Sequence, residues 1–150
     1  MLSSDDIRRS YVDFYTSRGH AEIPGSTLIG DSTVLFTSAG MQPLIPYFSG
    51  APHPSGRRLV NVQRCLRTVD IDEVGDDSHL TCFEMLGNWS LGDYYKHESL
   101  SWTLELLVEV LELDFDRLTF TVHPGDDEAY DRWVQLGVAP DRISALEDNW

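Results

Sequence analysis

The sequence has few cysteines and no clustered metal ligands. Its two cysteines, Cys65 and Cys82, do not form a CxxC pair, and its five histidines show neither an HxxxH spacing nor a grouping with cysteine. Disulfide-stapled domains and structural zinc sites need such patterns. The sequence therefore predicts free thiols, no disulfide framework and no metal site.

Long apolar runs are also absent. No segment approaches the roughly 18 consecutive apolar residues of a membrane span, and Met1–Asp6 lacks the basic and apolar regions of a secretory signal. These absences predict a cytoplasmic protein with no membrane partner. A hydrophobic content of 41% in 150 residues is enough to bury a core, which predicts a single domain.

Positive charge is scarce as well. Eleven Lys and Arg residues face 25 Asp and Glu residues, giving a net charge of −14. Nonspecific affinity for nucleic acid is built from Lys and Arg facing phosphates. Two interpretations stay open: the acidity only maintains solubility, or a nucleic-acid partner finds most of its contact surface elsewhere. The uneven charges are Asp70, Asp72, Glu73, Asp76 and Asp77 in one acidic loop, Asp126, Asp127 and Glu128 in a second acidic group, and Arg57, Arg58, Arg64 and Arg67 in a basic run.

Periodicity alternates between helical and extended patterns along the chain. Asp93 is expected to cap the longest helix, and the strands before it form a hairpin around the acidic loop. We expect an α/β (α+β) fold in one compact unit, with an antiparallel sheet flanked by helices. The expected helices are 4–18, 94–112 and 126–136, and the expected strands are Thr33–Thr37, Arg58–Arg67, His79–Met85 and Leu118–Val122.

The usual nucleotide and hydrolase signatures are missing, including the GxxxxGKS/T loop, GxGxxG, GxSxG and HExxH. The hairpin offers another device. Arg67 ends the first strand with a planar cation that suits a phosphate, and Phe83 on the return strand offers a flat ring for a base. The plainer alternative is a surface arginine over a core ring.

A long motif covers this hairpin and the turn after it. The segment Thr81–Lys96, TCFEMLGNWSLGDYYK, resembles the TFFEMLGNFSFGDYFK stretch of alanyl-tRNA synthetases. Shorter strings before and after this segment occur in the same order as in that family, so the resemblance covers essentially the whole chain. They are Gly19-His20, Leu35–Met41, Gln63–Arg67, Val74-Gly75 and Asp127–Tyr130.

The resemblance implies an incomplete class II aminoacyl-tRNA synthetase core that uses ATP with Mg2+ to convert alanine to alanyl-adenylate and then charges alanine tRNA. By likeness to the family, Arg67 is the catalytic and ATP-binding arginine at the α-phosphate, and Phe83 stacks on adenine. His79 lies near the triphosphate, where ligand contact and loop support are both open roles. The backbone of Met85 is matched to the adenine edge.

Two departures from the family stand out. After Arg67 the hairpin loop is short and lacks the lysine found in many members, and the sequence ends at Glu147–Trp150, before motif 3. The resemblance therefore assigns 1–150 to the N-terminal portion of the catalytic domain, with motifs 1 and 2. Trp150 matches the alanine-pocket tryptophan or the residue before it. An incomplete sheet predicts an exposed edge that could support self-association.

Three functional interpretations follow from these departures. The chain is part of a complete synthetase that charges tRNA with alanine, or a free-standing paralogue that acts as a nucleotide-binding, RNA-binding or regulatory module. The third is a ligase that activates an amino acid for another acceptor. Motif 3 supplies the arginine at the γ-phosphate in the family, so an active enzyme needs that cation from another source.

Overall fold

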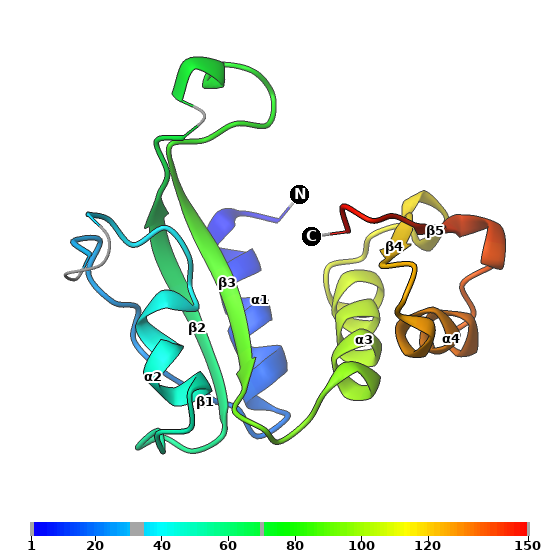
Figure 1. The fold of residues 1–150 in the computed structure, drawn as a ribbon, viewed down its shortest axis with the longest axis horizontal. Helices are drawn as coiled ribbons and strands as arrows, with labels where there is room; N and C mark the ends of the chain where they lie inside the picture. The colour runs from blue at the N-terminus through cyan, green and yellow to red at the C-terminus, as the bar shows by residue number, and fades with distance from the viewer. Residues whose placement is uncertain (1, 31–34, 70, 150) are drawn as a thin grey trace. The chain divides into compact units, whose positions relative to one another are not determined.

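The computed structural model describes residues 2–30, 35–69 and 71–149 of the chain. The chain divides into two units, Met1–Asp93 and Tyr94–Trp150 (Figure 1). The expected α/β class with an antiparallel hairpin flanked by helices is confirmed. The expectation of one compact unit is wrong, because the second unit closes a hydrophobic core of its own.

The first unit is built on a three-stranded sheet in the order β1-β2-β3. β1 (Ala21–Glu22) runs parallel to β2 (Arg58–Leu66), and β2 pairs antiparallel with β3 (Cys82–Ser90). The β2–β3 hairpin around the acidic loop is thus confirmed. β3 is an edge strand of this sheet. Self-association through its outer edge stays a prediction.

The bounds predicted for β3 are wrong. The strand starts three residues later than His79 and continues through Gly87 to Ser90, beyond the predicted end at Met85. A Cβ built at Gly87 would lie 2.4 Å from the Trp89 ring, so glycine is present there to admit a close ring rather than to end the strand.

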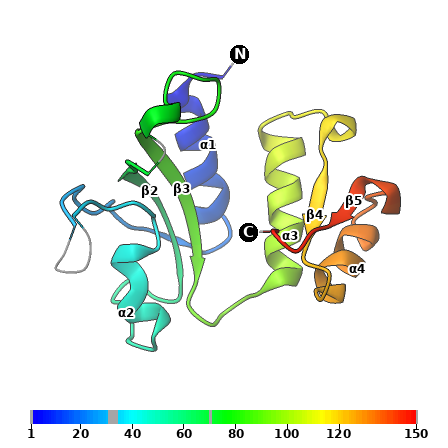
Figure 2. The ribbon, with the colours of Figure 1, turned by 45° about the horizontal axis from the view of Figure 1, so that its top comes forward.

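Helix α1 (Ser4–Thr16) agrees with the prediction except at its last turn. Ser3 and Asp6 form a capping box, in which each side chain accepts a hydrogen bond from the other's backbone amide. The Tyr11 hydroxyl donates to Oδ1 of Asn88 at 2.8 Å, which fixes α1 on one face of the sheet. Figures 1 and 2 both show α1 on that side and α2 on the other.

The opposite face is covered by a loop, η1 (Gln42–Leu44) and α2 (Ile45–Phe48). The Phe48 ring meets the Trp89 ring edge-on, with centroids 6.0 Å apart. Of the strand predicted at Thr33–Thr37, residues 33 and 34 lie outside the described residues. The described part forms only an isolated antiparallel bridge between Phe36 and Ile29.

The second unit begins with α3 (Lys96–Glu105), which continues into a π-helical turn, η3 (Leu106–Val110). The prediction that Asp93 caps this helix is wrong. The N-cap position is Tyr95, so the carboxylate precedes the cap, and it accepts a hydrogen bond of 2.8 Å from Nε of Arg58 instead.

The second unit ends in a β-α-β arrangement. β4 (Phe120–Val122) and β5 (Ile143–Ala145) are parallel and are joined through α4 (Asp127–Gln135), whose N-cap is Asp126. The predictions of β4 and α4 are confirmed to within two residues, whereas β5 was missed. The buried core residues of this unit are Phe120, Val122, Ala129, Trp133, Val138 and Ile143. The remaining short helices are η2 (Ile71–Glu73), η4 (Phe115–Arg117) and η5 (Pro140–Arg142).

Both cysteines are free; Cys65 is buried and Cys82 is exposed. Burial raises the pKa of the Cys65 thiol. Among the residues that the structure describes, no helix combines the length and apolar content of a membrane span.

Candidate functional site

The register of the hairpin brings Arg67 and Phe83 to one face. Cys65 is opposite Phe83 in the β2–β3 ladder, and the backbone N–H of Arg67 extends the pairing by donating to the Thr81 carbonyl at 2.9 Å. Because side chains alternate along a strand, Arg67 projects on the same side as Cys65 and Phe83. The guanidinium carbon of Arg67 lies 5.3 Å from the centre of the Phe83 ring.

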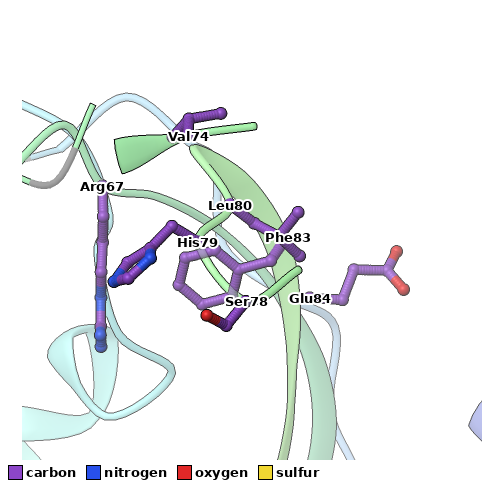
Figure 3. A pocket seen from close by; sticks show the side chains of 7 residues that line it. All are labelled: Arg67, Val74, Ser78, His79, Leu80, Phe83 and Glu84. Carbon is purple, nitrogen blue, oxygen red and sulfur yellow. The ribbon is translucent and has the colours of Figure 1, made fainter. Parts of the chain in front are cut away.

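A pocket of about 400 Å³ opens between this pair and the hairpin loop. Figure 3 shows the Arg67 side chain at one wall, the His79 ring next to it and the Phe83 ring beyond, with Glu84 directed away from all three. The pocket therefore gathers three of the four predicted ATP-binding residues. Its lining residues are Arg67, Val74, Ser78, His79, Leu80, Phe83 and Glu84.

Among the described residues, Arg67 is held through a single nitrogen of its guanidinium group. Its Nε–H donates to the carbonyl oxygen of Ser38 at 3.0 Å, and no carboxylate of the described residues lies within ion-pair distance. By contrast, Arg58 pairs with Asp93 at 2.7 Å. The two terminal nitrogens of Arg67 thus remain available to an anionic ligand, which is the fork geometry that recognises phosphate oxygens.

His79 belongs to a network of the hairpin loop. Its backbone N–H donates to Oδ1 of Asp76 at 2.7 Å, its Nδ1 lies 2.6 Å from Oδ2 of Asp76, and its Nε2 lies 3.3 Å from Glu73. These donors, first the His79 amide, then its ring and then the Ser78 amide, lower the pKa of Asp76 to about 2. The loop-support role is therefore observed, and the ligand-contact role stays a prediction.

Met85 lies two residues beyond Phe83 on the same side of β3 and opposite Gln63 in the ladder. Its sulfur accepts a hydrogen bond from the Gly40 amide at 3.4 Å, so the side chain joins the sheet to the covering loop. It does not line the pocket beside Phe83. The predicted substrate residue, Trp150, lies outside the described residues.

The other face of the hairpin has a structural role. Glu84 pairs with Arg8 of α1 and lies 3.9 Å from Nε of Arg64, while Asn88 accepts from Tyr11. These side chains alternate with Phe83 and Met85 and thus point to α1. Although they lie inside the best-matching motif, their contacts join helix to sheet rather than line the Arg67 pocket, except for Glu84 at its rim.

A second opening of about 600 Å³, which was not predicted from the sequence, lies beside Arg67. Exposed apolar side chains surround it, with Leu35 at 86% and Val69 at 89% exposure. Ser38 also contributes, and only its place in the Leu35–Met41 string could have indicated this. The lining residues are Leu35, Phe36, Ser38, Leu66, Arg67, Thr68 and Val69.

An antiparallel hairpin that presents an arginine and an aromatic ring on one face is the arrangement that the resemblance predicts for class II synthetases. The pattern of the family described as "tRNA synthetases class II (A)" matches residues 6–150, and the chain belongs to this family.

Three individual relatives share one name, alanine–tRNA ligase. The chain is 53% identical over 161 residues to an alanine–tRNA ligase of Treponema denticola, covering 99% of this chain and 27% of that protein. It is 53% identical over 155 residues to the alanine–tRNA ligase of Borrelia hermsii, and 45% identical over 148 residues to that of Dehalococcoides mccartyi. These matches cover 97% of this chain and 26% and 17% of the relatives. The chain thus spans about a quarter of the first relatives' length.

Proposed function

We propose that this chain supplies the ATP-holding part of an alanine–tRNA ligase. In this assignment, residues 1–150 are the N-terminal portion of the aminoacylation domain, with motif 1 ending at Met41 and motif 2 formed by the β2–β3 hairpin. Sequence identity of about one half to alanine–tRNA ligases supports the amino acid and the tRNA. As a translation enzyme, the protein would act in the cytoplasm.

The proposed reaction has two steps. A carboxylate oxygen of alanine attacks the α-phosphorus of ATP, and the bond from that phosphorus to the bridging oxygen breaks, releasing pyrophosphate. The terminal ribose hydroxyl of the tRNA then attacks the carbonyl carbon and loses its proton, and AMP leaves. Neither step requires a protein nucleophile, so positioning and charge neutralisation suffice.

The observation that carries the proposal is the Arg67–Phe83 pair. Phe83 offers its ring to adenine, and the terminal nitrogens of Arg67, which have no carboxylate partner in the described part of the chain, face the α-phosphate. Negative charge on the phosphorane-like transition state is stabilised by this fixed cation. Met85 and His79 are assigned to the adenine edge and the triphosphate.

Magnesium is assigned to the ATP rather than to the protein. Across residues 2–30, 35–69 and 71–149, no three or more His, Cys, Asp or Glu side chains gather as a metal site. Bound with ATP, magnesium supplies charge neutralisation beside Arg67. Because the net charge of this chain is −14, most tRNA contacts are assigned to parts of the ligase outside this chain.

Calorimetry with MgATP tests the proposal on the full chain. Arg67→Ala should weaken binding by ten- to a hundredfold, because a charge-assisted hydrogen bond contributes about 1.5–3 kcal/mol. Phe83→Ala should weaken it comparably through lost base stacking. Arg64→Ala is the matched control. Arg64 lies on β2 shortly before Arg67, its side chain is 75% exposed on the α1 side, and the variant should bind as wild type.

Alanine-dependent pyrophosphate exchange and tRNA charging separate the alternatives. Exchange with charging supports the complete assignment, and exchange without charging supports a ligase with another acceptor. ATP binding alone supports a nucleotide-binding module. Wild-type protein that does not bind MgATP, or that binds it equally after Arg67→Ala, would overturn the proposal.

A further inference from the structure

The loop Thr37–Gln42 is bound to the site face of the hairpin at several points. The backbone N–H of Leu66 donates to the Thr37 carbonyl at 2.9 Å, and the Gly40 amide donates to the sulfur of Met85 at 3.4 Å. Gly40 is buried, and a Cβ there would lie 3.0 Å from the Trp89 ring. The loop therefore lies directly on the strands that carry Arg67 and Phe83.

Within this loop, one carbonyl group orients Arg67. Ser38 accepts the Nε–H of Arg67 at 3.0 Å, which is the only hydrogen bond of that guanidinium within the described ranges. The guanidinium is planar, so fixing Nε sets the direction of both terminal nitrogens. The direction of the Ser38 carbonyl thus determines where Arg67 meets an anion.

The Gln42 side chain holds the peptide group that contains this carbonyl. Its Oε1 accepts from the amides of Ser38 at 2.7 Å and Ala39 at 3.3 Å. In a trans peptide, the carbonyl of Ser38 and the N–H of Ala39 lie in one plane and point in opposite directions. Gln42 holds the N–H on one side and so directs the carbonyl to the other, toward Arg67.

The surroundings of Gln42 make this link stable. Its backbone N–H donates to the Ala39 carbonyl at 3.2 Å, which closes the turn, and its side chain is half-buried. Gln42 is the first residue of η1, in which Pro43 limits backbone freedom. Among the residues that the structure describes, no other side chain accepts a hydrogen bond from the amides of Ser38 and Ala39.

We infer that Gln42 is a positioning residue that orients Arg67 through the Ser38 carbonyl and thereby sets the affinity for the phosphates of a nucleotide. The inference rests on the proposed ATP-binding role of Arg67. Gln42 itself does not touch the ligand in this scheme. Its effect therefore depends on Arg67 and on the presence of phosphate.

A double-mutant cycle on the full chain tests this dependence. Gln42→Met keeps the size of the side chain but removes the acceptor, and we expect about fivefold weaker MgATP binding. Adenosine binding should change less than twofold, because adenosine lacks phosphate. In an Arg67→Ala background, Gln42→Met should cause no further loss. Gln135→Met is the matched control, since Gln135 accepts from Arg132 at 3.2 Å in the second unit.

A second readout does not depend on nucleotide. The Nε–H NMR signal of Arg67 should exchange slowly in the wild type and rapidly after Gln42→Met. Gln42→Asn, which withdraws the oxygen by one methylene, is the milder variant if Gln42→Met does not fold, and both variants failing to fold would overturn the inference.

The outcomes distinguish the two proposals. An equal loss of MgATP affinity with and without Arg67, or unchanged affinity in Gln42→Met when Arg67→Ala abolishes binding, overturns the role of Gln42. Wild-type protein without MgATP binding overturns the proposed function, and the NMR arm then decides by itself whether Gln42 orients Arg67.

Discussion

The indole N–H of Trp89 donates a hydrogen bond of 2.9 Å to Oδ1 of Asn61 on the neighbouring strand. This bond holds the ring flat along the site face, above Gly87 and against Gly40. Asn61 is only 3% exposed, so its amide oxygen depends on this donor. The Trp89 ring thus contacts β2, β3 and the covering loop at the same time.

Gly87→Ala should destabilise the first unit severely. The new Cβ would lie 2.4 Å from the Trp89 ring, and moving the ring would break its bond to Asn61. We expect a loss of about 2–3 kcal/mol from overpacking, measured by urea unfolding. Gly125→Ala is the control, since its Cβ would have an ordinary contact of 3.4 Å; equal losses in the two variants would contradict the prediction.

Tyr11→Phe should loosen α1 from the sheet. The substitution removes the hydroxyl that donates to Asn88 at 2.8 Å while keeping the buried ring. The expected cost is about 1 kcal/mol in the free energy of unfolding. Tyr95→Phe serves as the control because Tyr95 is 72% exposed. A Tyr11→Phe protein as stable as the wild type would show that water replaces this bond without cost.

His20 should make stability depend on pH below neutrality. Burial lowers its pKa from the ordinary value, and its Nδ1 lies 2.9 Å from the Tyr15 carbonyl. The unfolded chain therefore binds the proton first, so stability is full above about pH 6.5 and falls as pH decreases from there. Urea midpoints from pH 8 to 5.5 should fall less steeply in His20→Gln than in the wild type. Parallel slopes would contradict this, and exposed His97→Gln should follow the wild type.

Asp76 should stabilise the hairpin loop down to acidic pH. Because its pKa is lowered to about 2 by the amide and ring of His79, its contribution is present above about pH 4 and is lost as pH falls toward 2. Asp76→Asn should speed amide exchange at Ser78 and His79 at neutral pH. Asp77→Asn is the matched neighbour and should exchange as the wild type does; equal acceleration would contradict the role of Asp76.

The pairing of Arg67 with Phe83 could be predicted from the sequence, because strand alternation fixes which side chains share a face. Gly87 could not, since a glycine that ends a strand and one that admits a ring look the same in a sequence. Ser38 acts through its backbone carbonyl, so the identity of its side chain does not indicate this role in the sequence. Asp93 is a residue type that often caps helices, but its carboxylate instead accepts a hydrogen bond from Arg58, which lies 35 residues earlier in the sequence.

The division into two units could not be predicted from the sequence for a different reason. Hydrophobic periodicity shows that an element buries a face, but not which core receives it. Phe120 and Trp133 pack with each other at 4.8 Å between ring centroids. The three-residue strand β5 buries only Ile143 and has no alternation to read.

Arg67 and Thr81 close the hairpin with a backbone hydrogen bond, so the segment 68–80 lies outside the β2–β3 ladder. Its length can change without altering which residues face each other on the strands. Doubling the length of such a loop costs only about 0.6 kcal/mol in closure entropy. Away from Val74 and Ser78–Leu80, which line the pocket, the hairpin tip is therefore an insertion point for a foreign peptide, an epitope or a fluorophore that leaves the strand register of Arg67 and Phe83 unchanged.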